Sequence, residues 1–245
     1  MSISLMEHNL KTYEELKENL KTNKSVAVVQ ATGTGKSYIA LKYIEEFCND
    51  NITIIVPSNI LADYWEKKMN EFVNINFKVL TYALISKCNR EQLSQIAEES
   101  ELIVFDELHR AGAAKWGKAV RYIIRSIKDK TRIIGLTATP VRSLDNNKDV
   151  VEELFEGNQI TGLDLKEAIV EGVLPTFKYV AAIYNIDEEI GRARESVANS
   201  RYLTPSEKKE YDRVFSTLLL NDDTAINIKK ILNKHLDTTR CQKII

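Results

Sequence analysis

Short hydrophobic runs alternate with amphipathic segments along most of the chain. The runs are rich in valine and isoleucine and predict five buried strands: Val26–Val29, Ile52–Val56, Phe77–Thr81, Leu102–Phe105 and Arg132–Leu136. Between them, apolar positions recur at helical spacing, as in Tyr38–Cys48 and Lys115–Lys128. Strands and helices that alternate in this way predict an α/β fold, with a mostly parallel central sheet and helices on both of its faces.

Beyond about residue 160 the pattern changes to charged and mostly helical sequence. The segment Asp164–Glu171 has capping-box spacing at its start and Gly172 just past its end, which predicts one short helix. Thr204–Glu207 is a second capping box, with proline at the first helical position, and predicts a helix that extends to about residue 220.

These patterns suggest a division into two parts. We expect residues 1–184 to form the first domain, with Phe177–Tyr184 as one more strand. Residues 185–245 are expected to be a mostly helical linker, with a helix around Ile228–His235 and the start of another strand at Cys241–Ile245.

A glycine-rich segment, Gln30–Ser37, lies between the first predicted strand and a helix, which is the context of a phosphate-binding loop. Its glycines let backbone N–H groups point at phosphate oxygens, and the following helix adds its positive end. Lys36 would reach the β- and γ-phosphates, and the Ser37 hydroxyl would bind Mg²⁺. Gln30 stands where such loops usually begin with glycine. The residues predicted to hold the nucleotide are Ala31, Thr32, Gly33, Thr34, Gly35, Lys36 and Ser37.

An apolar strand that ends in two carboxylates, Asp106 and Glu107, follows later in the chain. A parallel strand of this kind places Asp106 at the carboxyl edge of the sheet beside the loop, where it also contributes to the nucleotide site and can hold Mg²⁺ through water. Glu107 is then placed to orient and deprotonate an attacking water molecule, which favours hydrolysis over transfer of the phosphoryl group to a metabolite. On this reading Glu107, Lys36 and His109 form the catalytic set, and His109 also has a coupling role.

Three segments resemble motifs I, II and III of superfamily 2 helicases: Ala31–Ser37 (ATGTGKS), Asp106–His109 (DELH) and Thr137–Pro140 (TATP). Their order and spacing resemble a first RecA-like domain of the DEAD/DEAH-type group that includes the helicase subunit of type III restriction enzymes. The resemblance covers about residues 7–180.

Weaker resemblances extend this comparison to three further segments: Ile55–Leu61 to motif Ia, Val79–Tyr82 to the stretch before motif II, and Leu165–Pro175 to the stretch after motif III. Asn9 lies near the position at which such proteins carry a glutamine that reads adenine, so selectivity for adenine stays open.

The resemblance implies roles for further residues. Thr137 and Thr139 would couple nucleotide state to grip on nucleic acid through their hydroxyl groups. Ser58 and Asn59 would contact a phosphate of one strand, and the segment with Thr81 and Tyr82 would lie on the same nucleic-acid path. A simple turn after a buried strand would also explain Ser58 and Asn59.

As a whole, the resemblance implies an ATP hydrolase that uses Mg²⁺ and couples hydrolysis to movement on nucleic acid, with DNA favoured over RNA. Other subunits of a restriction or repair system are possible partners. The expected second RecA-like domain would supply an arginine finger, which is typically worth ~10³–10⁵ in rate. We therefore expect residues 1–245 alone to bind Mg·ATP and to hydrolyse it slowly. The alternatives are a truncated or degenerate binding module without significant turnover, and a different P-loop motor.

Composition limits where and how such a protein can act. Hydrophobic residues make up 44% of the chain and charged residues 28%, which suits a packed core. The net charge of −1 means that nucleic-acid contacts must come from local sites or from other parts of the protein. Three scattered cysteines indicate neither a zinc site nor a disulfide framework. Without a signal-peptide pattern or an apolar run of about 18 residues, we expect a cytoplasmic protein that does not contact membranes.

Overall fold

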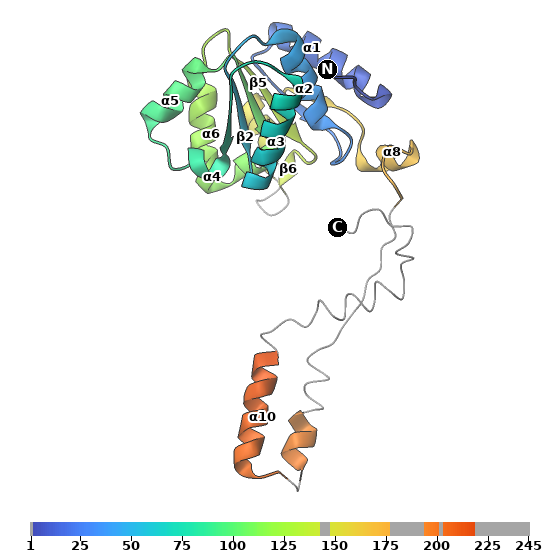
Figure 1. The fold of residues 1–245 in the computed structure, drawn as a ribbon, viewed down its shortest axis with the longest axis vertical. Coiled ribbons are helices and arrows are strands. Elements are labelled where there is room, and N and C mark those ends of the chain that lie inside the picture. Colours follow the sequence, from blue (N-terminus) through green and yellow to red (C-terminus); the bar gives the residue numbers. More distant parts are fainter. Residues whose placement is uncertain (1, 143–147, 177–193, 201–202, 219–245) are drawn as a thin grey trace. The chain divides into compact units, whose positions relative to one another are not determined.

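The computed structural model describes residues 2–142, 148–176, 194–200 and 203–218 (Figure 1). The chain divides into two compact units, Met1–Thr176 and Phe177–Ile245. The predicted division after residue 184 falls outside the described residues, as do the predicted strand Phe177–Tyr184, the helix around Ile228–His235 and the strand start at Cys241–Ile245. These stay predictions.

A six-stranded sheet, in which every pair of neighbouring strands is parallel, forms the centre of the first unit. In spatial order the strands are β3 (Phe77–Thr81), β2 (Ile52–Val56), β4 (Leu102–Asp106), β5 (Arg132–Thr137), β1 (Ser25–Val29) and β8 (Gln159–Thr161). The five predicted strands are confirmed to within one residue at each end. The sixth, β8, was not predicted, because three residues are too few to show a period.

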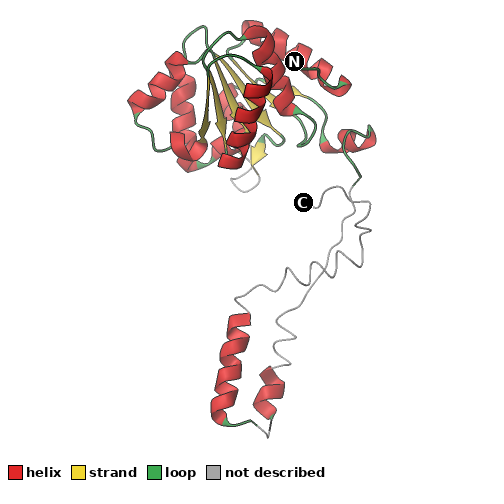
Figure 2. Ribbon diagram, in the orientation of Figure 1, coloured by secondary structure: helices red, strands yellow, loops and turns green. Residues whose placement is uncertain are grey.

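Helices cover both faces of this sheet, as the sequence predicted (Figures 1 and 2). One face packs against α1 (Glu7–Thr22), α2 (Lys36–Phe47) and α3 (Asn59–Phe72). The other packs against α4 (Tyr82–Ile85), α5 (Arg90–Glu99), the 3-10 turn η1 (Leu108–Gly112), α6 (Ala114–Ser126) and α7 (Val150–Phe155). The mostly parallel α/β fold is therefore confirmed.

Alternation along each strand divides the core between these two layers. In β2, Ile54 and Val56 face the α1–α3 layer while Ile55 faces the other. The same alternation in β4 directs Val104 toward the first layer and Phe105 toward the second. Because all strands are parallel, every carboxyl end lies at one edge of the sheet, where loops can place functional side chains together.

The remaining elements of the first unit are short. A two-stranded antiparallel hairpin pairs β6 (Val141–Arg142) with β7 (Lys148–Asp149). The predicted capping box opens α8 (Leu165–Val170): Asp164 Oδ1 accepts from the Glu167 N–H at 2.7 Å, and Glu167 Oε2 accepts from the Asp164 N–H at 3.0 Å. Gly172 follows at φ +72°, a left-handed conformation that glycine adopts without strain.

In the second unit the described residues form two helices, at 194–199 and at α10 (Pro205–Leu218). The predicted capping box is present, with the Thr204 N–H donating to Glu207 Oε2 at 2.8 Å and the Glu207 N–H donating to Thr204 Oγ1 at 3.4 Å. The helical character predicted for this region is confirmed for these residues.

A close contact at Gly135 allows a first test of the packing on the α4–α7 side. A Cβ placed on Gly135 would lie 2.5 Å from Phe155 Cε2 and 2.7 Å from Leu108 Cδ2. Gly135→Ala should therefore lower the free energy of unfolding by about 1–3 kcal/mol, the usual cost of overpacking. Urea titration followed by tryptophan fluorescence would measure it. The cost should shrink in a Phe155→Leu background, and an unchanged urea midpoint for Gly135→Ala would contradict the packing described.

Candidate nucleotide-binding site

The glycine-rich loop connects β1 to α2 at the carboxyl edge of the sheet. Gly33 has φ +88°, and Gly35, which precedes the first residue of α2, has φ +98°. Side chains rarely tolerate these angles, so glycine is required at both positions. The loop thereby turns its backbone into the amino-terminal end of a twelve-residue helix, where N–H groups and the helix dipole favour an anion.

A buried hydrogen-bond network supports this loop from behind and explains why Gln30 can replace the usual glycine. Gln30 is 2% exposed, and its Nε2 donates to Asn9 Oδ1 and to Thr34 Oγ1, both at 2.7 Å. The Asn9 Nδ2 donates in turn to the Thr34 carbonyl at 2.9 Å, and His8 Nε2 lies 2.8 Å from the same oxygen. The glutamine side chain thus stabilises the loop from within.

Sequence reasoning gave no role to His8 and Gln30, and considered Asn9 only as a residue near the position of the glutamine that reads adenine. Both groups of the Asn9 amide are engaged with Gln30 and Thr34. The sequence did contain one sign of this network, namely a glutamine at position 30 where such loops usually begin with glycine. A large polar side chain that is buried next to a turn requires hydrogen-bond partners.

Lys36 is buried within the loop and donates to the carbonyl oxygens of Gln30 at 2.9 Å and Ala31 at 3.1 Å. Burial lowers the pKa of its ammonium group, while the charges of Glu107 and Asp106 act in the opposite direction. Both hydrogen-bond acceptors of Lys36 are neutral carbonyls, and the phosphates of a nucleotide would give its ammonium group charged acceptors.

The two carboxylates at the end of β4 have different environments. Asp106 is buried, which raises its pKa most strongly, while a hydrogen bond from Trp65 and the charge of Lys36 lower it. The Glu107 side chain is partly exposed, and its backbone is left-handed at φ +50° and ψ +54°. Such a conformation costs about 1–3 kcal/mol in a residue with a side chain and is concentrated at functional sites.

The strand order places the loop and the carboxylates at one location. β5 lies between β4 and β1, and all three strands are parallel. Asp106 is the last residue of β4 and the glycine-rich loop follows β1, so both lie at the same edge of the sheet. The charges of both carboxylates act to raise the pKa of Lys36, and the charge of Lys36 acts to lower the pKa of Asp106, as expected for groups at one edge of the sheet. This is the arrangement that the sequence predicted.

His109 links the acidic pair to the end of β5. Its Nδ1 lies 3.3 Å from Glu107 Oε2 and 3.3 Å from the Thr137 hydroxyl. The Thr137 hydroxyl donates to the Thr139 carbonyl at 3.1 Å and accepts from the Thr139 N–H at 3.2 Å. Sequence reasoning expected both threonines to act through hydroxyl groups. Thr139 instead joins this connection through its backbone.

The residues predicted to contact nucleic acid lie at the ends of β2 and β3, which are neighbours in the sheet. Ser58 caps α3 by accepting from the Leu61 N–H at 3.4 Å, and Thr81 caps α4 by accepting from the Leu84 N–H at 3.1 Å. A hydroxyl that accepts in this way can still donate its hydrogen to a phosphate. Asn59 is exposed beside Ser58.

The prediction that Tyr82 contacts nucleic acid is wrong for its side chain. The ring is fully buried and stacks on Phe105 and Trp116, with centroid distances of 6.4 and 5.7 Å. Its hydroxyl donates to the Asp106 backbone carbonyl at 3.0 Å. Thr81 is partly exposed at the end of β3, and its contact with nucleic acid stays a prediction. Tyr82 follows it as the first residue of α4 and is buried in the core.

The residues present fit Mg²⁺ together with a nucleotide, and not a protein-only metal centre. Among the described residues, no group of three or more His, Cys, Asp or Glu side chains could hold a metal ion. Ser37, in the first turn of α2, and Asp106 would supply the two protein ligands, and phosphate oxygens and water would complete the shell that Mg²⁺ prefers.

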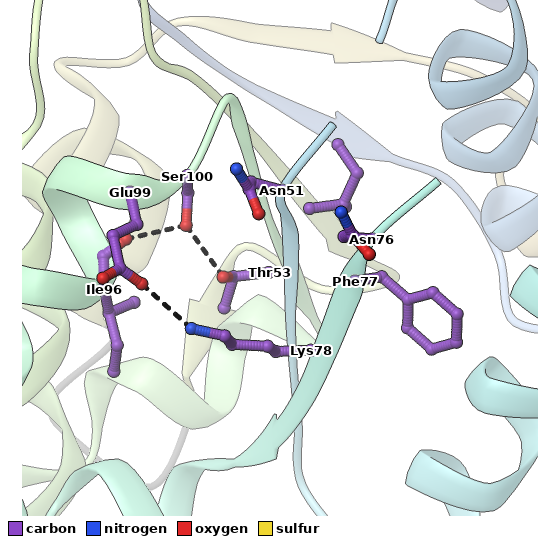
Figure 3. A pocket seen from close by; sticks show the side chains of 9 residues that line it. Asn51, Thr53, Asn76, Phe77, Lys78, Ile96, Glu99 and Ser100 are labelled. Carbon is purple, nitrogen blue, oxygen red and sulfur yellow. Dashed lines mark hydrogen bonds and ion pairs between the residues drawn. The ribbon is translucent and has the colours of Figure 1, made fainter. Parts of the chain in front are cut away.

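Figure 3 shows a separate cavity at the opposite, amino-terminal edge of the sheet. Lys78 and Glu99 form an ion pair of 3.0 Å beside it, and the Thr53 and Ser100 hydroxyls bond at 2.8 Å. Its volume is about 40 Å³. That is room for water rather than for a nucleotide, so it is not a second candidate for the site.

Comparison with known proteins agrees with this geometry. The family model described as "Type III restriction enzyme, res subunit" matches residues 2–142, which is more than half of the chain. The chain belongs to this family. Within the described residues, the chain contains no helix that is both long and apolar enough to cross a membrane.

Curated relatives of this chain include two much longer proteins. An uncharacterized protein of Mycobacterium leprae is 31% identical over 140 residues, which are 48% of this chain and 23% of that protein. The type I restriction enzyme EcoAI endonuclease subunit of Escherichia coli is 30% identical over 185 residues, which are 66% of this chain and 22% of that protein. The chain therefore spans less than a quarter of the length of either relative.

A solved structure extends the comparison to the fold. The helicase domain of Pyrococcus furiosus Hef matches 79% of this chain and 48% of its own, with a TM-score of 0.50 and 18% identity. At this identity the likeness concerns the fold alone. Together with the family match, it shows that the first unit of the chain is a RecA-like domain of the superfamily 2 helicase type.

The contact between Gln30 and Gly162 tests the network behind the loop. A Cβ on Gly162 would overlap Gln30 Oε1, so Gly162→Ala should lower the free energy of unfolding by about 1–3 kcal/mol. In a Gln30→Gly background the same change should cost clearly less, because the overlapping side chain is absent. Urea unfolding of the four variants in a double-mutant cycle would measure the coupling. Strictly additive costs would show that Gln30 does not occupy this space.

Proposed function

We propose that the chain binds Mg·ATP and hydrolyses it as the motor domain of a superfamily 2 helicase or translocase that moves on DNA. One observation supports this most strongly: the glycine-rich loop with Lys36 and the pair Asp106–Glu107 meet at one edge of the sheet, close enough to interact electrostatically. Binding requires the first group and hydrolysis requires the second.

Each residue has a separate task in this proposal. The phosphates are bound by the backbone from Ala31 to Gly35 and by the amino-terminal end of α2. Lys36 neutralises their charge, and Ser37 and Asp106 hold Mg²⁺. When bound, Mg²⁺ would neutralise charge on the phosphate oxygens. Glu107 orients a water molecule and accepts its proton, and its partly exposed carboxylate is compatible with access by water.

His109 and Thr137 would report the state of this site to the end of β5. Their contacts form a continuous path from Glu107 to Thr139 in which each separation is at most 3.3 Å. A change in the position of Glu107 would therefore alter the backbone of motif III, which in the family lies between nucleotide and nucleic acid.

DNA is the proposed track because the family and one relative are named for restriction enzymes. Ser58, Asn59 and Thr81 would contact the sugar–phosphate backbone, which implies weak sequence preference. Partners in the whole protein would include a second RecA-like domain and the other subunits of a restriction or repair system. Without an arginine finger from the second domain, turnover by residues 1–245 should be slow.

Lys36→Ala should abolish the binding of Mg·ATP, because it removes the buried ammonium group from the phosphate loop. Isothermal titration calorimetry would measure the loss. Lys11→Ala, on the exposed side of α1, is the matched control and should bind as the unmodified chain does. The binding proposal is wrong if Lys36→Ala binds Mg·ATP with unchanged heat and affinity.

Glu107→Gln should change the affinity for Mg·ATP by no more than a few-fold. It should lower the rate of single-turnover hydrolysis by about 10²–10⁴-fold, since a general base contributes on that order. Phosphate release under excess enzyme would measure this, with Glu66→Gln on the exposed side of α3 as the control. If the unmodified chain binds Mg·ATP but hydrolyses it no faster than Glu107→Gln, the motor proposal fails and a nucleotide-binding module remains.

A further inference from the structure

Two fully buried aromatic side chains donate hydrogen bonds to Asp106. Trp65 Nε1 donates to the carboxylate Oδ2 at 2.8 Å, and the Tyr82 hydroxyl donates to the backbone carbonyl at 3.0 Å. Both side chains have no exposed area. Neither residue belongs to the motifs that bind phosphate or metal, yet both hold the residue proposed to bind Mg²⁺.

Each donor belongs to a helix that begins at the proposed nucleic-acid edge. Trp65 lies in α3, about two turns beyond the capping residue Ser58. Tyr82 is the first residue of α4 and directly follows its capping residue Thr81. The strands that lead into the two helices, β2 and β3, are neighbours and end at the same edge of the sheet. From each helix one aromatic side chain reaches Asp106.

The two donors reach Asp106 from opposite layers of the fold. Trp65 packs in the core between the sheet and α1–α3, whereas Tyr82 packs in the core on the α4–α7 side. Asp106 is therefore fixed to both layers at once. A displacement of either helix start would act on Asp106 through a different atom.

We propose that Trp65 and Tyr82 are positioning residues that transmit the placement of the α3 and α4 starts, where nucleic acid would bind, to the metal-binding Asp106 and to Glu107 after it. This inference rests on the proposed function of the same site. In this inference, nucleic-acid binding is coupled to metal binding through the buried side chains of Trp65 and Tyr82. This route is separate from the one through His109 and Thr137.

The bond from Trp65 sets the orientation of the carboxylate. Oδ2 accepts from Trp65, and Oδ1 accepts from the Glu107 N–H at 3.0 Å. Each oxygen keeps further lone pairs for a metal ion or its water, so the two bonds orient the carboxylate without blocking it. A shift of α3 by about 1 Å would lengthen the Trp65 bond beyond hydrogen-bonding range and release this orientation.

The bond from Tyr82 acts on the backbone instead. It holds the Asp106 carbonyl immediately before Glu107, whose left-handed backbone directs the proposed general base. Loss of this bond should therefore disturb Glu107 more than the metal. The two aromatic residues thus predict different defects: Trp65 in metal affinity, and Tyr82 in turnover.

Trp65→Phe should weaken Mg²⁺ binding in the presence of ATP by about 10–100-fold, the usual loss when a group that orients a metal ligand is removed. Calorimetric titration of MgCl₂ into the chain saturated with ATP would measure it. Binding of ATP in EDTA should stay unchanged, whereas a general structural defect would weaken both. The matched control is Trp116→Phe, which removes a ring stacked on Tyr82 and keeps the bond to Asp106.

Tyr82→Phe removes one hydroxyl from the buried ring and should keep the fold and the Mg²⁺ affinity. Single-turnover hydrolysis should fall by about 10–100-fold at saturating Mg·ATP. This split between binding and turnover provides a second test should Trp65→Phe fail to fold. Equal Mg²⁺ affinity and equal turnover in both variants and in the unmodified chain would overturn the inference.

The transmission itself is tested by thermodynamic linkage. A fluorescein-labelled single-stranded oligodeoxynucleotide should bind the unmodified chain with different affinities with and without Mg·ATP, and both variants should bring that ratio toward one. A ratio of one in the unmodified chain, or an unchanged ratio in both variants, overturns the transmission. If the unmodified chain does not bind Mg·ATP at all, the proposed function fails together with the inference. If the unmodified chain binds Mg·ATP and both variants behave as it does in every measurement, the inference fails while the proposed function stands.

Discussion

Burial of the Asp106 carboxylate is the constraint that organises this edge of the molecule. A carboxylate at the end of a central strand loses its hydration and must be compensated by hydrogen bonds and opposite charge. Trp65 and the Glu107 N–H supply the hydrogen bonds, and Lys36 supplies the charge. The α3 core and the phosphate loop are thereby fixed to one residue. The arrangement also explains why a tryptophan stands on the buried side of α3, because its ring N–H can donate to the carboxylate and an aliphatic side chain could not.

The phosphate loop shows how one departure from a common pattern is compensated elsewhere. Gln30 at the loop entrance occupies space that a glycine would leave empty, and the chain accommodates it with Gly162 on the adjacent β8 segment. Asn9 and Thr34 satisfy its amide nitrogen. The result joins α1, the loop and β8 into one buried network, so residues far apart in sequence together determine the loop conformation that a nucleotide would meet.

Much of the fold follows from local sequence, because runs such as Ile52–Val56 and the capping boxes at Asp164 and Thr204 carry their information within a few residues. The convergence of the glycine-rich loop with Asp106 and Glu107 was also predictable, because parallel strands bring their carboxyl ends to one edge of the sheet. What the sequence could not provide was contact between side chains of distant elements. Tyr82 was predicted to contact nucleic acid because Val79–Tyr82 resembles the stretch before motif II. Trp65 received no role, since neither sequence position reveals the bond to Asp106.

The left-handed backbone of Glu107 indicates why so many contacts meet here. A strained residue persists only where its surroundings overdetermine it. The Tyr82 hydroxyl donates to the carbonyl of Asp106, just before Glu107. The Arg110 N–H donates to the Glu107 carbonyl at 2.8 Å, and His109 lies beside the Glu107 carboxylate. These contacts come from α4 and η1, and the path from His109 continues to Thr137 at the end of β5. If Glu107 is the general base proposed above, elements that lead toward both proposed ligands hold it, so the rate of hydrolysis would respond to either ligand.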